Sequence, residues 1–144
     1  MGYDIEQFNE DVQQQIRSKV GTTKTKSSGR NDFEHELQVQ AMKYMRLQYP
    51  ELDRQIFAIP NGGARDPVTG KKLKDEGVLA GVWDLFIAIP SGDYHGCFIE
   101  TKWGKNGLSD SQKKFKQANN KHYYFFVYRT LDEFIEKLQQ YLNQ

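Results

Sequence analysis

The chain has 144 residues, of which 38% are apolar, and its formal net charge is +1. These values fit one globular domain with an additional segment, and the charge excludes a chain that is basic throughout, so a surface for an anionic partner has to come from local clusters of lysine. The lone Cys97 excludes a disulfide framework within the chain. Because we find no signal-peptide order and no apolar run near the roughly 20 residues that span a bilayer, we expect a soluble, cytoplasmic protein without a membrane partner.

The first thirty residues differ in pattern from the rest of the chain. Apolar side chains recur at helical spacing over residues 4–20, namely Ile5, Phe8, Val12 and Ile16. A polar run with several lysines follows, so we interpret residues 1–30 as an amphipathic helix with a basic linker and residues 31–144 as the domain proper. The apolar stripe fits packing on this domain or on a second copy, and the sequence leaves both open.

From residue 31 onward, helical and strand patterns follow one another. Asn31 is a candidate N-cap for the first helix. The expected elements are a helix over 32–49, a strand over 55–60, a glycine-containing basic loop over 61–77, two strands over 85–89 and 97–102 joined by a turn at 91–94, a helix over 108–120, a strand over 122–128 and a helix over 131–142. The short turn makes the two middle strands an antiparallel hairpin, while the helix before the last strand permits a parallel crossover. This order, α-β-β-β-α-β and a last helix, predicts an α/β fold with a mixed sheet of about four strands flanked by helices.

Charged residues stand at the ends of the two hairpin strands. Asp84 precedes the first strand, and Glu100 and Lys102 share a face at the end of the second, because side chains two apart in a strand point the same way. Pairing through the turn brings Asp84 and Glu100 to the same end of the sheet. Two carboxylates in a partly dry place raise each other's pKa, and a hard cation such as Mg²⁺, which binds carboxylates, water and phosphate, relieves the conflict. Lys102 would then position or activate a water, or offset negative charge in a transition state; the alternative is an ordinary ion pair with Glu100 at a solvated strand end.

Two more polar side chains are predicted to reach the same place. Glu34 falls inside the apolar arc of the first helix, so its carboxylate needs a partner, such as a metal-bound water. The alternative is a first-turn acid that is favourable to the helix dipole. Gln112 lies on the inward stripe of the lysine-rich helix, either bonded to the site or bonded to backbone at its rim. The apolar members of that stripe are Leu108, Phe115 and Ala118.

Together these residues resemble the PD-(D/E)XK nuclease superfamily, with "WD" at 83–84 where the family has "PD", and "ETK" at 100–102 matching (D/E)XK. More narrowly, the chain looks like the VRR-NUC family. The supporting pieces, in order, are "EHELQ" at 34–38, "IPNGG" at 59–63, "GVLAGVWDLFI" at 77–87, "FIETK" at 98–102 and "LSDSQKKF" at 108–115. Five pieces in order with compatible spacing are fairly specific, and the resemblance covers about residues 32–143.

The resemblance implies a restriction-endonuclease-like core and a metal-dependent nuclease that hydrolyses phosphodiester bonds. In it Asp84 and Glu100, with Glu34 at the metal site, would bind Mg²⁺ or Mn²⁺, Lys102 would support the attacking water, and Gln112 would complete the pocket. Stand-alone members of the family tend to be homodimers and are often phage-encoded, so the resemblance also implies a homodimer and, for a phage protein, a location in the host cytoplasm.

Within this resemblance the basic loop gains a role in binding nucleic acid. Glycine amides can approach a phosphate without interference from Cβ, and lysines on the loop and on the next helix contact phosphate without reading sequence, which predicts salt-sensitive binding. The predicted contacts are Asn61, Gly62, Gly63, Arg65, Lys71, Lys72, Lys74, Lys105 and Lys113. The alternatives are a solvated turn-rich loop and lysines that serve solubility.

The leading hypothesis is therefore a divalent-metal-dependent DNA endonuclease, with selectivity for branched or junction DNA as a related hypothesis. The alternative is a non-catalytic nucleic-acid-binding module with the same fold, which would have no chemical use for the set of Asp84, Glu100 and Lys102. Cleavage of RNA stays open, because no feature that reads a 2′-hydroxyl is identifiable.

Overall fold

The fold is taken from a computed structural model that describes residues 29–60 and 66–144, together with residues 10, 11 and 14. The predicted helix over residues 4–20 lies almost entirely outside the described residues, as do Asn61, Gly62, Gly63 and Arg65. Their predicted roles, and the domain boundary at residue 30, therefore stay predictions.

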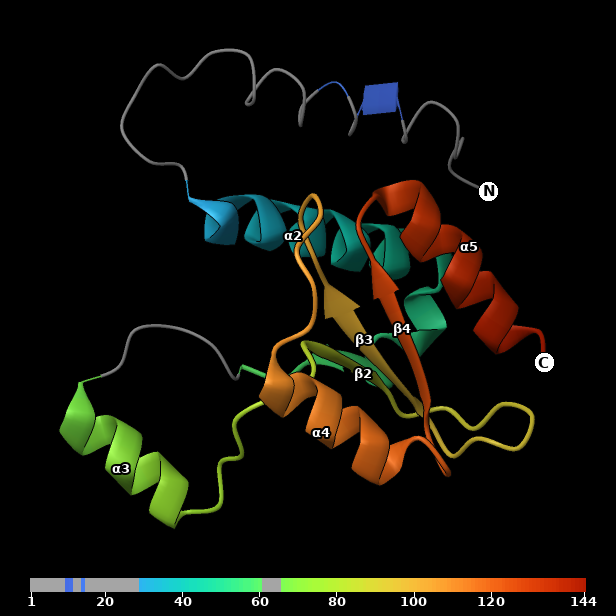
Figure 1. The fold of residues 1–144 in the computed structure, drawn as a ribbon. Coiled ribbons are helices and arrows are strands. Elements are labelled where there is room, and N and C mark those ends of the chain that lie inside the picture. Colours follow the sequence, from blue (N-terminus) through green and yellow to red (C-terminus); the bar gives the residue numbers. More distant parts are fainter. Residues whose placement is uncertain (1–9, 12–13, 15–28, 61–65) are drawn as a thin grey trace.

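A mixed sheet stands at the centre of the described part of the chain (Figure 1). Its four strands, in the order in which they pair, are β1 (Ile56–Ala58), β2 (Leu85–Ile87), β3 (Cys97–Thr101) and β4 (Tyr124–Tyr128). β2 pairs antiparallel with both β1 and β3, whereas β3 and β4 are parallel. The helical crossover between β3 and β4 permits that parallel pair, and the predicted mixed α/β sheet is confirmed.

Helices lie on both sides of this sheet. Figure 1 shows α2 (Arg30–Gln48) and α5 (Leu131–Leu142) together on one side and α4 (Asp110–Asn119) on the other. The predicted N-cap at Asn31 is wrong, because the helix already begins at Arg30, with Gly29 as its N-cap. A short 3-10 turn, η1 (Pro50–Leu52), follows α2, as the proline there requires an end to the α-helix. No helix in the described ranges has the length and apolarity needed to cross a bilayer.

Strand alternation divides β3 between two environments. Cys97 and Ile99 are fully buried in the core that α2 and α5 cover. The alternate residue Phe98 faces α4 instead, where its ring meets that of Phe115 with centroids 4.9 Å apart. Glu100 follows the same parity as Phe98, so the fold directs its carboxylate to the α4 side of the sheet.

The predicted loop over residues 61–77 is wrong in its described part, because it contains the helix α3 (Pro67–Asp75). Asp66 caps this helix: its Oδ1 accepts hydrogen bonds from the amides of Val68 and Thr69 at 3.1 and 3.0 Å. Pro67 at the first helical position has no amide to leave unpaired. Asp66 and Pro67 therefore start a helix here, although the glycines and the proline of this segment also favour a turn-rich loop. Figure 1 shows α3 projecting away from the sheet, and Val68 is 78% exposed.

Candidate active site

Asp84 and Glu100 meet where β2 and β3 pair at one end of the sheet. Leu85 pairs with Ile99, which places the two acidic residues opposite each other. The amide of Asp84 donates to Glu100 Oε2 over 3.2 Å, and the amide of Thr101 donates to Asp84 Oδ2 over 3.0 Å. Each carboxylate is therefore held by main chain of the neighbouring strand. The predicted proximity of the two acids is confirmed, and it follows from strand pairing alone.

Lys102 completes a buried charged group at this end of the sheet. Its Nζ lies 3.0 Å from Glu100 Oε1, and the two residues are only 6% and 2% exposed. The alternative prediction, an ion pair between Lys102 and Glu100 at a solvated strand end, is correct in its partners. It is wrong in its surroundings, because the pair is buried. Burying both charges carries a desolvation cost that their attraction only partly offsets, so this pair is weak evidence for a purely stabilising role.

Gln112 reaches the same carboxylate from α4. Ser109 and Gln112 form a capping box at the start of this helix, in which Gln112 Oε1 accepts from the Ser109 amide over 2.9 Å. The amide nitrogen of Gln112 then donates to Glu100 Oε1 over 2.6 Å. Both alternatives for this residue are thus correct at once, since one end of its amide bonds backbone and the other bonds the site. Ala118, predicted to face inward, is exposed; Asn119 is partly buried in its stead.

Glu34 lies at the edge of this group. Its Oε1 accepts a hydrogen bond from the amide of Trp103 over 3.2 Å, and Phe33 stacks on the Trp103 ring with centroids 4.6 Å apart. These contacts join the start of α2 to the segment that follows Lys102. The negative charge of Glu34 also raises the pKa of Asp84, which places its carboxylate within electrostatic reach of the site.

The site disfavours its own negative charge. Burial, followed by the charge of Asp84, raises the pKa of Glu100 to about 7, although Lys102 opposes the shift. Burial also raises the pKa of Asp84, against the hydrogen bond from Thr101 and the charge of Lys102. A single ammonium group therefore does not offset two buried carboxylates, and a further cation would favour ionisation of both.

Comparison with known proteins identifies the family. No family model matches the sequence, and neither does any curated protein. A solved structure described as "VRR_NUC domain protein" is similar to this chain, with a TM-score of 0.65 and 30% sequence identity. The likeness covers 76% of this chain and 88% of that chain. The chain belongs to the VRR-NUC family. The predicted VRR-NUC resemblance and restriction-endonuclease-like fold are confirmed.

The oxygen donors of this VRR-NUC domain fit a small hard cation. Asp84 and Glu100 supply carboxylate oxygens, which the pairing of β2 and β3 brings to the same end of the sheet. No group of three or more histidine, cysteine or acidic side chains that could hold a metal occurs among the residues described. A cation with only two protein carboxylates keeps its water and binds substrate, which is the usual mode of Mg²⁺.

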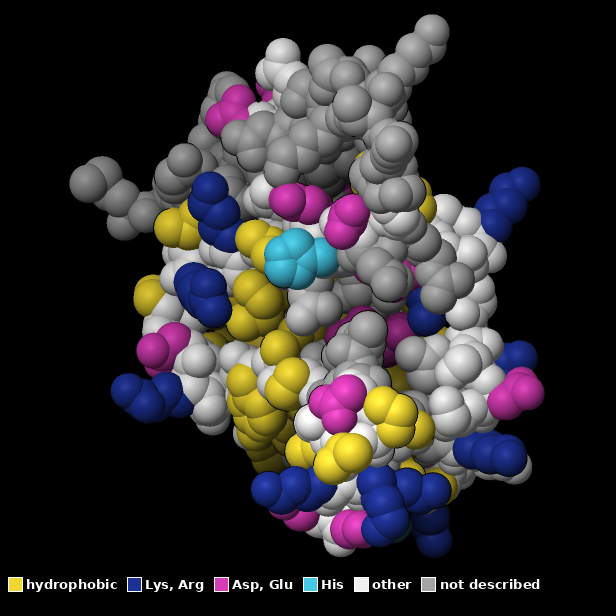
Figure 2. Space-filling view, turned by 90° about the vertical axis from the view of Figure 1, so that its left-hand side faces the viewer, with side chains coloured by type: hydrophobic (Ala, Val, Ile, Leu, Met, Phe, Trp, Pro, Cys, Tyr) yellow, Lys and Arg dark blue, Asp and Glu magenta, His cyan; other side chains and the backbone are white. Residues whose placement is uncertain are grey.

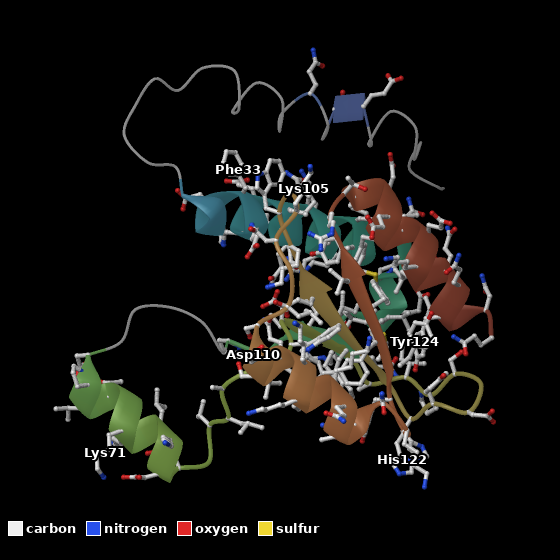
Figure 3. All side chains as sticks on the ribbon, viewed as in Figure 1. Phe33, Lys71, Lys105, Asp110, His122 and Tyr124 are labelled. Atoms are coloured by element: carbon white, nitrogen blue, oxygen red, sulfur yellow. The ribbon has the colours of Figure 1, made fainter. Side chains whose placement is uncertain are left out.

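The predicted nucleic-acid contacts of the VRR-NUC domain are dispersed. Lys71, Lys72 and Lys74 lie exposed on α3, Lys105 follows β3 and Lys113 lies on α4. Figure 3 shows Lys71 and Lys105 far apart, Lys105 beside the first turns of α2, so the two cannot contact one phosphate. Figure 2 looks at the side of the molecule from which α3 projects. Lysine and arginine side chains gather on the lower part of that side.

Sequence reasoning missed two features of the site. The indole N–H of the buried Trp83 donates to the main-chain oxygen of Gln112 over 3.1 Å, which ties α4 to the residue before Asp84. Thr101 donates its hydroxyl to the Tyr128 phenol over 2.6 Å beneath the site. The Trp-Asp pair was a usable signal for the first, whereas the second depends on the register of β3 and β4, which the sequence does not specify.

Proposed function

We propose that this VRR-NUC domain is a divalent-metal-dependent DNA endonuclease that hydrolyses phosphodiester bonds. The observation that carries the proposal is the buried group of Asp84, Glu100 and Lys102, in which the Lys102 Nζ lies 3.0 Å from the Glu100 carboxylate. Membership of a nuclease family supports the same reading, and the name of the similar structure contains the family's designation.

Each residue of the site has a distinct role in this proposal. Asp84 and Glu100 would hold Mg²⁺ or Mn²⁺, and Glu34 would act on the same cation through a bound water. When bound, the cation stabilises negative charge on the phosphate and lowers the pKa of water. Lys102 donates hydrogen bonds that orient the attacking water, and its charge stabilises the pentacovalent transition state. Gln112 holds Glu100 Oε1 in place through its 2.6 Å hydrogen bond.

The substrate and the assembly are further parts of the proposal. The exposed lysines of α3, with Lys105 and Lys113, are proposed to contact DNA phosphates, which recognises backbone and shape rather than sequence. A homodimer would present two such sites related by a two-fold axis, and this arrangement suits branched or junction DNA.

Cleavage by the purified protein, with a matched pair of variants, tests the proposal. Asp84→Asn keeps the shape of the side chain but removes the ligand charge. Asp93→Asn makes the same change at an exposed residue in the turn at the other end of β2 and β3. Linear duplex, flap and four-way-junction DNA would be incubated with Mg²⁺, Mn²⁺ or EDTA.

We expect cleavage in Mg²⁺ or Mn²⁺ and none in EDTA. Asp84→Asn should lower the rate by at least about 10²-fold, the scale of losing one electrostatic contributor to catalysis, while Asp93→Asn keeps the wild-type rate. Cleavage that persists in EDTA, or equal rates for the two variants, would overturn the proposal. The ranking of the DNA substrates decides whether branched DNA is preferred.

A further inference from the structure

Thr101 stands between Glu100 and Lys102, but its side chain enters the opposite face of the sheet. The residue is 1% exposed, and its hydroxyl donates to the phenol oxygen of Tyr128 over 2.6 Å. Tyr128, the last residue of β4, is fully buried and packs on Phe134 of α5 with ring centroids 4.9 Å apart. Among the described residues, the only hydrogen-bond partner of either hydroxyl is the other. Buried hydroxyl groups need such partners, so the two are mutually dependent.

The main chain around Thr101 is held by two of the neighbouring strands. Its amide donates to Asp84 Oδ2 over 3.0 Å, and the next amide, that of Lys102, donates to the carbonyl oxygen of Tyr128 over 3.1 Å. Tyr128 therefore bonds the Thr101 hydroxyl with its phenol oxygen and the Lys102 amide with its carbonyl oxygen. The Thr101 amide belongs to the peptide that joins it to Glu100, and the Lys102 amide belongs to the next peptide. A displacement of Thr101 would therefore strain the hydrogen bonds to Asp84 and to Tyr128 together.

We infer that Thr101 and Tyr128 are a positioning pair for the active site, an inference that rests on the proposed function. Threonine is restricted at χ1, and the hydrogen bond to Tyr128 fixes its hydroxyl as well. The Thr101 amide then holds the Asp84 carboxylate in the orientation that binds the cation, and the next peptide, held at the Lys102 amide by the Tyr128 carbonyl, directs Lys102 into the site. Groups that bond to metal ligands in this way commonly determine both metal affinity and activity.

One variant removes the contact and a matched variant controls for stability. Tyr128→Phe deletes only the hydroxyl group and keeps the ring against Phe134. Tyr141→Phe deletes the same group from another fully buried tyrosine, whose hydroxyl donates to the Ile89 carbonyl over 2.6 Å at the other end of the sheet. The measurements, on the full chain, are Mn²⁺ affinity by calorimetric titration, kcat and KM for DNA cleavage, and melting temperature.

Tyr128→Phe should lower both Mn²⁺ affinity and kcat by roughly 10- to 100-fold with KM for DNA little changed. Tyr141→Phe should lower the melting temperature and leave Mn²⁺ affinity and kcat at wild-type values. If Tyr128→Phe lowers only the melting temperature, as Tyr141→Phe does, the phenol has a packing role and the inference is overturned.

Variants of Thr101 test the pair from its other side, also in case Tyr128→Phe does not fold. Thr101→Val keeps the shape without the hydroxyl and should reproduce the loss, whereas Thr101→Ser keeps the hydroxyl and should restore wild-type values. Equal behaviour of the valine and serine variants overturns the inference.

Asp84→Asn distinguishes a failure of the proposed function from a failure of the positioning role. If it binds Mn²⁺ and cleaves like the wild type, the proposed function fails; if it loses both while Tyr128→Phe and Thr101→Val keep both, only the positioning role fails.

Discussion

Glu100 holds its carboxylate where only 2% of the residue is exposed, with Asp84 directly across the strand pair. Its position on this face follows from two-residue alternation in β3, so the sequence was sufficient to locate Glu100 and Lys102 together. The contact from Gln112 was predictable in the same way, because helical spacing puts this residue on the side of α4 that faces the sheet. Thr101 and Tyr128 were not predictable, since their hydrogen bond requires the parallel register of two strands that are distant in sequence.

The raised pKa of Glu100 predicts how the stability of the metal-free protein depends on pH. Its ordinary pKa of 4.5 in the unfolded chain becomes about 7 in the fold. Between these values the folded state keeps a proton that the unfolded state has released, so the free energy of unfolding decreases as the pH rises. The loss is complete above pH 7 and amounts to a few kcal/mol at most, since one pKa unit is about 1.4 kcal/mol.

Chemical denaturation in EDTA between pH 4.5 and 8 measures this effect. Glu100→Gln removes one of the two carboxyl groups whose pKa is raised and should make the profile less steep over that range, whereas Asp93→Asn, in the exposed turn, should keep the wild-type slope. Mg²⁺ added in excess over the EDTA at pH 8 should restore stability to the wild type. A Glu100→Gln profile as steep as that of the wild type would show that other groups cause the slope.

At the scale of elements, the placement of α4 depends on one glycine. Gly81 has a φ of +93°, and a Cβ on it would come within 2.5 Å of the main-chain carbonyl carbon of Ser111 at the start of α4. This close approach brings Gln112 within reach of both Glu100 and the Trp83 indole. The "GVWD" segment therefore determines both the position of Asp84 and the position of α4, whose Gln112 supports the site.

We predict that Gly81→Ala displaces α4 and weakens the site. Gly77→Ala is its matched control, because Gly77 has a similar φ of +99° with nothing within 4 Å of a Cβ. Both changes carry the backbone cost of about 1–2 kcal/mol for a left-handed residue. Only Gly81→Ala should lose more stability than this and also lower the cleavage rate, as measured by denaturation and by DNA cleavage. Equal effects of the two variants would mean that α4 does not depend on this contact.

The element that sequence reasoning predicted wrongly is α3. Its glycines and proline favoured a loop, but Asp66 and Pro67 together supply the N-cap and the first helical position. The other helices were predicted nearly in full because their apolar residues contact the sheet, as Phe115 of α4 does at Phe98, whereas the apolar Val68 of α3 is 78% exposed.

At the scale of the whole molecule, the small net charge of +1 conceals an uneven distribution. The lysines of α3 are exposed on a helix that projects away from the sheet in Figure 1. The overall fold could be predicted from the order of its elements and from the turn at residues 91–94. The arrangement of the basic side chains could not, because it depends on where α3 points and no periodicity in the sequence encodes that direction.

Replacing Lys71, Lys72 and Lys74 together by glutamine should weaken DNA binding. The slope of log K against log salt concentration should become shallower by about 0.9 for each phosphate that the variant no longer neutralises, without a change in the cation affinity of the site. The control replaces three other exposed bases, Lys43, Arg54 and Lys121, by glutamine. Fluorescence titration of labelled duplex at several salt concentrations gives the slopes. An unchanged slope for the α3 variant, or an equal change in both, would remove α3 from the DNA-binding surface.

The central claim is that Asp84 and Glu100, at the paired ends of β2 and β3, hold the cation on which cleavage depends. The most direct measurement is an anomalous difference map from crystals of the wild type and of Asp84→Asn grown with Mn²⁺. We expect a strong peak in contact with the Asp84 and Glu100 carboxylates of the wild type and its loss in the variant. A peak elsewhere, or no peak in a protein that cleaves DNA under the same conditions, would contradict the account.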